Sequence, residues 1–275
     1  MELEIFSLYK DFFNFLDRIK NKEVKWKSYL INYYEPHREF LDSYLKHFPF
    51  LDASTLRQRV EATKPEDYSW LRHLLSFSPP EEIIRAAYKK CSMAVAPEIV
   101  PQVFLFIGYF SPEGFVMEFR GKPVICFGLE RFKDFRLLKI LFAHEYAHFL
   151  LNSREGEILE EKKLKWLLLC EGFCAYFSSL VFQDSQLSEH LLFPRDVLNW
   201  SQENLPLLRE VYLSHKYSDE EIFEIYFKGK HELGILPRTG RYLGFQAVKR
   251  FLSRKDDPKI GELIKDKALL LSIKI

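Results

Sequence analysis

The stretch "LFAHEYAHFLL" (residues 141–151) places two histidines and a glutamate inside a run of apolar side chains. Burying such groups without a partner costs on the order of several kcal/mol. Residues four apart on an α-helix lie on one face, so His144 and His148 can bind the same ion. Glu145 lies about 100° around the helix from His144, beside that ion. The stretch therefore predicts a buried helix that carries a metal site.

The HExxH spacing of this stretch is found in zinc metallopeptidases, where both histidines bind zinc and the glutamate is the general base. Zinc lowers the pKa of a bound water towards about 7 and polarises the carbonyl that is attacked. A chance match is the alternative interpretation. The apolar helix around the motif, together with uncharged residues at Tyr146 and Ala147, favours the metal site.

A catalytic zinc site needs a third protein ligand, and Glu171 is the strongest candidate. It interrupts the apolar stretch "WLLLCEGFCAYF" (166–177), where an unpaired carboxylate would be costly. Gly172 and Ala175 are small enough for this helix to pack closely on the first. Arg154 stands where a metzincin would place its third histidine, which excludes that class. Other residues of ligand type within reach in the sequence are Glu155, Glu157, Glu160, Glu161, Cys170, Cys174, Asp184 and His190.

Some residues of ligand type have a simpler interpretation. Cys170 and Cys174 are expected to be small buried side chains, although one of them could compete for zinc as a soft donor. His37, His47 and His73 occur singly in the first third of the chain, outside any ligand spacing. Isolated matches of this kind are weak evidence, so we do not expect these histidines to bind a metal.

HEYAH followed by "EGFCAYF" (171–177) resembles the gluzincin arrangement, in which a glutamate on the next helix is the third ligand. The chain is most similar to the predicted zinc-dependent proteases long catalogued as a domain of unknown function. The likeness covers roughly residues 98–253. It implies that His144, His148 and Glu171 bind Zn²⁺ and that Glu145 is the base.

The same likeness implies a role for Tyr242, in the stretch "RTGRYLGFQAVKRFL" (238–252). A zinc peptidase needs a hydrogen-bond donor for the charge that develops in the transition state. Tyr242 stands in the first turn of a predicted helix, near Arg238 and Arg241. The alternative interpretation is a tyrosine of the core. His231 and His215 are the next candidates from the sequence.

The sequence predicts an α+β fold with a helical N-terminal region at residues 1–97 and a zincin-like metallopeptidase domain at residues 98–275. That domain should hold a small antiparallel or mixed sheet, the HEYAH helix, a second long helix and C-terminal helices. The stretches expected as two or three antiparallel strands are 103–110, 114–121 and 124–132. By the resemblance, residues 115–121 or 124–130 could form the edge that pairs with extended substrate; a plain structural hairpin is the alternative.

Composition limits the classes of function. The chain has 40 Lys and Arg against 39 Asp and Glu, so its net charge of +1 gives no reason to expect nucleic acid. Its four cysteines form no CxxC pair, and the start lacks a secretory signal, which favours the cytoplasm. Glu171 at the centre of the apolar stretch 165–182 favours a buried helix over a membrane span.

We therefore expect a cytoplasmic zinc metallopeptidase that hydrolyses peptide or protein substrates, with neither nucleic acid nor membrane as a partner. The alternative is a zinc-stabilised, chaperone-like or peptide-binding protein that does not cut. A fourth protein ligand on the metal would favour that alternative. Substrate specificity and oligomeric state do not follow from the sequence.

Overall fold

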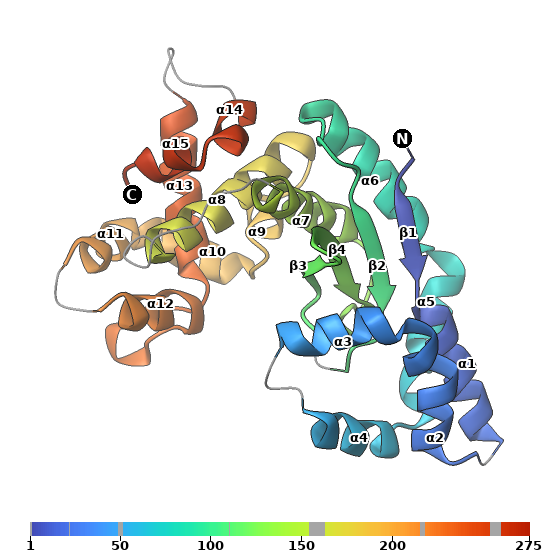
Figure 1. The fold of residues 1–275 in the computed structure, drawn as a ribbon. Helices are drawn as coiled ribbons and strands as arrows, with labels where there is room; N and C mark the ends of the chain where they lie inside the picture. The colour runs from blue at the N-terminus through green and yellow to red at the C-terminus, as the bar shows by residue number, and fades with distance from the viewer. Residues whose placement is uncertain are drawn as a thin grey trace. The chain divides into compact units, whose positions relative to one another are not determined.

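The structure is a computed structural model that describes residues 2–21, 23–48, 52–109, 111–153, 163–214, 218–253 and 260–275 (Figure 1). Its contacts divide the chain into two compact units. Unit 1 comprises residues 1–89 and 96–139, and unit 2 comprises residues 90–95 and 140–275. The strands that follow residue 97 thus group with the N-terminal helices. The sequence predicted two domains that meet at residue 97. That division stays a prediction, because the two units describe contacts and not independent folding.

Unit 1 contains a four-stranded mixed sheet, which confirms the α+β class. The strand order is β1-β2-β4-β3, with bounds β1 (Glu4–Ser7), β2 (Gln102–Phe106), β3 (Gly114–Phe119) and β4 (Lys122–Gly128). β1 and β4 both run parallel to β2, and only β3 and β4 are antiparallel. The expectation of purely antiparallel strands was therefore wrong for β2 and β4.

The sequence explains which part of the sheet prediction held. Arg120 and Gly121 both have positive φ (54° and 71°), as the tight turn of a two-residue hairpin requires, so β3 and β4 pair as neighbours. The segment between β2 and β3 does not form such a turn, which lets β4 lie between β2 and β3. β3 is thus an edge strand, whereas β4 is internal. If either predicted strand pairs with a peptide, it must be β3.

The helices of unit 1 confirm the helical N-terminal third. The elements are α1 (Tyr9–Lys20), α2 (Lys25–Tyr29), η1 (Leu30–Tyr34), η2 (Glu35–His37), α3 (Arg38–His47), α4 (Ala53–Ala62), η3 (Pro65–Tyr68), α5 (Ser69–Phe77), α6 (Pro80–Ala94, whose last residues belong to unit 2) and η4 (Leu129–Arg131). Aromatic side chains join them to the sheet: Phe40 of α3 stacks on Phe104 of β2 with ring centroids 4.2 Å apart. The Tyr33 hydroxyl donates to Ile107 O and accepts from Ile107 N, which fixes the end of β2.

A buried carboxyl group lies beside the same end of β2. Oε1 of Glu130 accepts hydrogen bonds from Gly108 N (3.0 Å) and Ser111 Oγ (2.9 Å). Oε2 is buried without a hydrogen-bond partner among the described residues. Burial, only partly offset by these hydrogen bonds, raises the pKa of Glu130 to about 7.

We expect Glu130→Gln to remove part of the pH dependence of stability. A folded-state pKa above that of the unfolded chain means that folded protein holds the proton between about pH 4.5 and 7, so stability falls as pH rises through that window. Glutamine keeps the acceptor oxygen and cannot ionise. Wild type should therefore lose more stability than Glu130→Gln between pH 5 and 8, by on the order of 2–3 kcal/mol. Thermal unfolding at both pH values checks this; parallel losses in the two proteins would contradict it.

Unit 2 is helical around two clusters of buried apolar side chains. Its elements are α7 (Leu138–Asn152, which starts at the end of unit 1), α8 (Lys163–Val181), α9 (Leu187–His190), α10 (Arg195–Glu203), α11 (Leu205–Leu213), α12 (Asp219–Lys228), η6 (His231–Leu233), α13 (Thr239–Leu252), α14 (Ile260–Lys265) and α15 (Lys267–Ser272). One cluster includes Leu168, Tyr226 and Leu243. The other includes Ala175, Tyr242 and Phe245. Both clusters use α8 and α13, so this helix pair forms the centre of the unit.

In the described part of the chain, α8 is the helix whose length and composition would allow it to cross a membrane. Of the apolar window in α8, 56% is buried within the structure. Core helices of globular proteins have the same length and composition, so this property of α8 does not assign it to a bilayer.

Candidate metal centre

The predicted motif lies on a buried helix. α7 is apolar almost all round and runs through the HEYAH motif without interruption. His144 is 1% exposed and Glu145 5% exposed. The Tyr146 hydroxyl donates a 2.8 Å hydrogen bond to Val95 O, which ties the middle of α7 to the end of α6. His144 and Glu145 are therefore shielded from water, whereas the side chain of His148 is 16% exposed.

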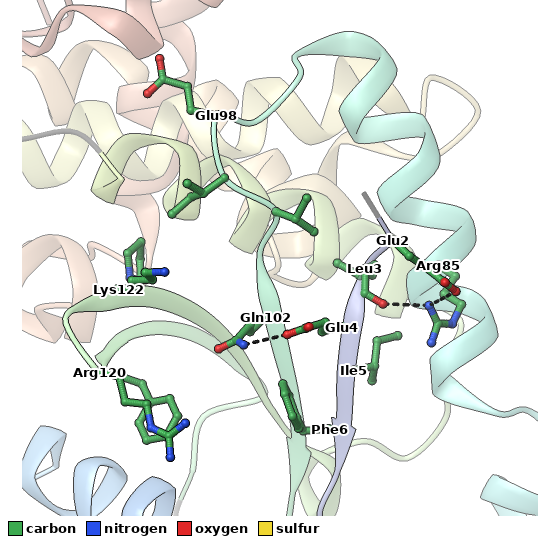
Figure 2. Close-up of a pocket in the computed structure, with 14 residues that line it drawn as sticks. Glu2, Leu3, Glu4, Ile5, Phe6, Arg85, Glu98, Gln102, Arg120 and Lys122 are labelled. Atoms are coloured by element: carbon green, nitrogen blue, oxygen red, sulfur yellow. Dashed lines mark hydrogen bonds and ion pairs between the residues drawn. The ribbon is translucent and has the colours of Figure 1, made fainter.

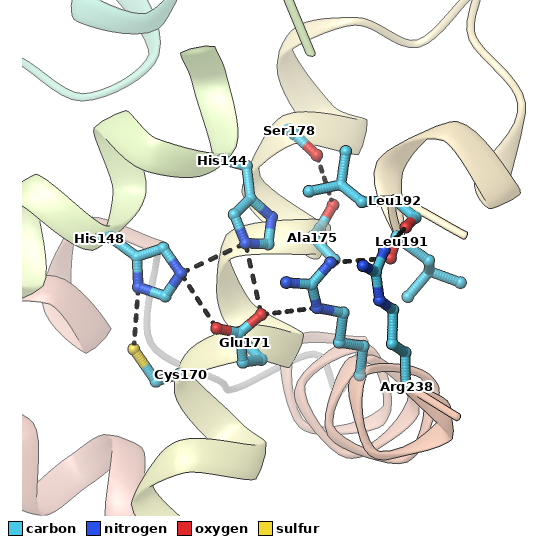
Figure 3. Close-up of polar contacts among 10 residues, drawn as sticks. His144, His148, Cys170, Glu171, Ala175, Ser178, Leu191, Leu192 and Arg238 are labelled. Carbon is cyan, nitrogen blue, oxygen red and sulfur yellow. Dashed lines mark hydrogen bonds and ion pairs between the residues drawn. The ribbon is translucent and has the colours of Figure 1, made fainter. Parts of the chain in front are cut away.

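The structure brings together the three side chains predicted to bind zinc (Figure 3). The Nε2 atoms of His144 and His148 are 3.2 Å apart. Glu171 on α8 turns its carboxylate towards both rings, with Oε2 3.5 Å from His144 Nε2 and Oε1 3.4 Å from His148 Nε2. Two ring nitrogens and the two oxygens of one carboxylate, from two helices, thus lie together, with each ring facing a different oxygen of Glu171.

The separations in this cluster are of the size expected between ligands of one zinc ion. Nitrogen and oxygen ligands lie about 2.0–2.1 Å from zinc in tetrahedral sites, which separates two ligands by roughly 3.3 Å. The observed separations of 3.2–3.5 Å match that value. Neutral imidazole and carboxylate are also donor types that zinc accepts. His144, His148 and Glu171 therefore fit a zinc ion.

The charges of the three groups follow from their surroundings. Burial lowers the pKa of His144 to about 4, which keeps its ring neutral, the form that binds metals. Burial alone would raise the pKa of Glu171, but Arg241 and the two histidines hold it well below its usual range. Burial opposes protonation of His148, yet Cys170 and Glu171 hold its pKa above its usual value. A metal must therefore displace a proton at His148.

Arg241 is the site residue whose contact the sequence did not predict. Its Nε lies 2.8 Å from Glu171 Oε2, which is an ion pair. The N–H group is not aligned for a hydrogen bond, so both buried atoms lack a hydrogen-bond partner among the described residues. Its Nη1 donates to Leu191 O at 3.4 Å. Arg241 thus holds one oxygen of the Glu171 carboxylate.

The approach of Arg241 depends on close packing of α8 on α13. A Cβ built on Gly172 would lie 2.1 Å from Gly244 C, and one on Gly244 would lie 1.8 Å from Leu168 O. Only glycine at both positions allows the two backbones to approach this closely. We had expected Gly172 to allow packing on the HEYAH helix, and that was wrong, because its Cα faces α13. Arg241, one turn before Gly244, therefore reaches Glu171.

We expect Arg241→Gln to weaken zinc binding by about 10- to 100-fold, the usual effect of losing a group that orients a metal ligand. The variant releases the Glu171 carboxylate and raises the cost of keeping it ionised in a buried site. Arg238→Gln is the matched control, because Arg238 lies on the same turn of chain but donates to Leu192 O (3.0 Å) instead. Competition with a zinc chelator measures both affinities. Equal losses in the two variants would show that the Glu171 contact has no specific role.

Glu145 lies next to the cluster of donor atoms but outside it. Burial raises the pKa of Glu145 to about 7, with Glu171 adding to the rise. A carboxyl group with a pKa near the working pH can both accept and release a proton. The group is thus chemically suited to proton transfer.

The two cysteines of α8 occupy different sides of the site. Cys170 Sγ lies 3.4 Å from His148 Nδ1, the ring nitrogen that faces away from Glu171. A hydrogen bond with Cys174 and the nearby His148 lower the pKa of Cys170 to about 6, against the effect of burial. Cys174 Sγ lies within 4.8 Å of a ring nitrogen of His144 and of His148. Cys174, rather than Cys170, is therefore the additional candidate donor.

Tyr242 does not lie among these groups. Its side chain is 4% exposed and belongs to the apolar cluster with Ala175 and Phe245. Burial raises its pKa, and the polar groups that act on it are Gln246 and Arg209. A role for its hydroxyl in a reaction stays a prediction.

The remaining residues of ligand type either make contacts away from the candidate metal centre or lie outside the residues that the structure describes. His190 contacts Ser178 Oγ at 3.0 Å through its Nδ1. In unit 1, His37 contacts Asp11, His47 stacks on Phe115, and His73 lies against Phe77. Glu155, Glu157, Glu160, Glu161, His215 and the side chain of His231 lie outside the described residues.

Unit 1 contains a groove of about 1080 Å³ (Figure 2). It lies over the start of the sheet, between β1 and the β3–β4 hairpin. Its polar groups largely bond to one another or to neighbours: Gln102 donates to Glu4, Arg85 to Leu3 O, and Arg120 pairs with Glu39. It holds no group of metal ligands among the described residues. The chemistry of the chain is therefore concentrated in unit 2.

No protein family, curated protein or solved structure matches this chain.

Proposed function

We propose that this protein is a zinc-dependent peptidase that hydrolyses peptide bonds in peptide or protein substrates. His144, His148 and Glu171 would hold the ion, in a core of zincin type, and the protein would act in the cytoplasm without nucleic acid or a membrane. The observation that carries the proposal is the cluster of two ring nitrogens and one carboxylate, with the nitrogens 3.2 Å apart and each 3.4–3.5 Å from an oxygen of Glu171. Its size and donor types are those of a zinc site.

Zinc at such a site supplies Lewis-acid activation of water and of the carbonyl group. Glu145 would take a proton from the attacking water and pass it to the leaving amine, which a pKa of about 7 permits in both directions. Arg241 would keep Glu171 ionised and oriented through the 2.8 Å contact. Cys170 would hold the His148 ring through Nδ1, so that Nε2 faces the other donors.

A second candidate function is a zinc-stabilised protein that binds peptides without cutting them. The observation that favours it is Cys174, whose Sγ lies within 4.8 Å of a ring nitrogen of both histidines. Four protein ligands would close a zinc site to water, as in structural zinc sites. The two functions differ in whether a bound peptide is cleaved.

The experiment that tests the proposal combines metal analysis of purified protein with digestion of a mixed peptide library, read by mass spectrometry. We expect one zinc per chain and cleaved peptides that disappear when a chelator removes the metal. Zinc without cleavage would favour the peptide-binding function. Cleavage that survives complete removal of metal would overturn the proposal.

We expect His144→Ala, His148→Ala and Glu171→Ala each to reduce zinc affinity at least about tenfold, because each removes one donor from the ion. His73→Ala is the control, since His73 lies against Phe77 in unit 1. Zinc content after dialysis against a chelator measures the effect. Full zinc retention in Glu171→Ala would show that another residue is the third ligand.

A further inference from the structure

Two thiol groups stand one helical turn apart beside the candidate metal centre. Cys170 and Cys174 both lie on α8, and their side chains are hydrogen-bonded to each other. Cys170 is 6% exposed and Cys174 0% exposed. The proposed hydrolysis of peptides gives Cys174 no role. Its position is therefore an observation that the proposed function leaves unexplained.

The location of Cys174 Sγ relative to the histidines is what distinguishes it. Its distance to a ring nitrogen of each histidine is at most 4.8 Å. A nitrogen and a sulfur bound to one tetrahedral zinc ion lie roughly 3.6 Å apart, given bonds of about 2.1 and 2.3 Å. A side-chain movement of about 1 Å would therefore bring the sulfur to that separation from one ring nitrogen of each histidine.

Cys170 cannot take the same role. Its Sγ lies 3.4 Å from His148 Nδ1, whereas the nitrogen that faces His144 and Glu171 is Nε2. Figure 3 shows that Cys170 and Glu171 contact different ring nitrogens of His148. An ion at Nε2 thus lies away from Cys170. The two cysteines differ in position but share residue type, helix and burial, which makes one a control for the other.

We propose that Cys174 is a fourth donor to the ion, so that the resting centre contains two imidazole nitrogens, the Glu171 carboxylate and a thiolate. This inference rests on the proposed function only in assuming that His144 and His148 hold a metal. The Cys174 thiol gives its proton to solvent as the sulfur–metal bond forms, because a metal deprotonates a thiol that coordinates it. Cys174 then occupies the position that a catalytic site leaves to water.

Two consequences follow from a thiolate donor. The centre should bind zinc, cobalt or cadmium far better than magnesium or calcium, because thiolate is a soft ligand. Hydrolysis at this centre should also require the sulfur to leave the metal and water to replace it in each active molecule. Cys174 would thereby regulate the same site that His144, His148 and Glu171 form.

The test uses full-length protein loaded with Co²⁺ in place of zinc, with bound cobalt measured per chain. Thiolate bound to Co²⁺ gives a charge-transfer absorption in the near ultraviolet that nitrogen and oxygen ligands do not give. We expect this band in wild type and in Cys170→Ser, and its loss in Cys174→Ser and Cys174→Ala with cobalt still bound. Wild type that binds cobalt without the band, or a band that survives in both Cys174 variants, would overturn the proposal.

X-ray absorption of zinc-loaded wild type tests the same point without a variant that must fold. We expect one sulfur at about 2.3 Å from zinc together with nitrogen and oxygen neighbours. A first shell of nitrogen and oxygen alone would overturn the proposal. Peptide digestion distinguishes this outcome from failure of the proposed function. A sulfur ligand without cleavage would support Cys174 as a donor and contradict the peptidase function. Cleavage by a site without a sulfur ligand would support the peptidase function and contradict Cys174 as a donor.

Discussion

Glu145→Gln is expected to retain zinc and the fold while it hydrolyses peptides at least about 100-fold more slowly than wild type, the usual scale for loss of a general base. Glutamine has nearly the shape of glutamate but cannot accept the proton from water. Because Glu145 is 5% exposed and sits beside, not in, the cluster of donor atoms, neither packing nor metal ligation should change. Zinc content, thermal unfolding and turnover of one cleavable peptide from the library measure the three quantities.

Glu130→Gln is the matched control for that variant. It also removes a buried carboxyl group whose pKa is raised to about 7, but one that bonds to Gly108 and Ser111 in unit 1. Its turnover should equal that of wild type. Near-wild-type turnover in zinc-loaded Glu145→Gln would remove Glu145 from the mechanism, and an equal loss in Glu130→Gln would indicate a general effect of losing a buried carboxyl group.

The positions of the candidate ligands could be predicted from the sequence where helix geometry alone decides them, while their role as ligands stays a prediction. A four-residue spacing puts His144 and His148 on one face in any helix, and a lone carboxylate in an apolar helix must find partners. The pairing of Glu171 with both histidines agrees with that expectation. The identity of the metal and the reaction stay predictions, because neither follows from the positions of three donors.

Arg241 and Tyr242 show where sequence reasoning failed to rank neighbours. Both residues stand in the first turn of α13, and the resemblance pointed to Tyr242. On a helix, adjacent residues point about 100° apart, and Arg241 is the one whose side chain contacts Glu171 of α8. Tyr242 packs with Ala175 of α8 instead, and its role in a reaction stays a prediction. The crossing of α8 and α13 depends on a contact between Gly172 and Gly244, which lie far apart in the sequence.

The sheet was predicted in content but not in connectivity. β-branched and aromatic residues identified β2, β3 and β4, although the expected strand 114–121 included Arg120 and Gly121, which form the hairpin turn in the structure. Nothing local indicates that β4 lies between β2 and β3. β1 (Glu4–Ser7) was missed, although the alternation of Leu3 and Ile5 with Glu2 and Glu4 is the signal of a half-buried strand. Four residues are too few for that pattern to outweigh the helical sequence that follows.

Gly172→Ala is expected to destabilise unit 2 by about 3 kcal/mol, roughly a 150-fold change in its folding equilibrium. The new Cβ would lie 2.1 Å from Gly244 C and 2.3 Å from Phe245 N. Both are backbone atoms, which cannot rotate away, so α8 and α13 must separate. The gain in helix propensity from replacing glycine with alanine, about 1 kcal/mol, offsets only part of this cost.

Gly261→Ala is the control that separates the contact from the change of residue type. Gly261 also lies in a helix, α14, but a Cβ there meets no atom within 4 Å. It should leave stability unchanged or raise it by up to about 1 kcal/mol. Gly172→Ala should in addition weaken zinc binding, because separating the helices moves Arg241 away from Glu171, and Gly261→Ala should not. Chemical denaturation measures the stability, and competition with a chelator measures the zinc affinity. Wild-type values of both for Gly172→Ala would mean that the glycine contact does not fix the helix crossing that positions Arg241.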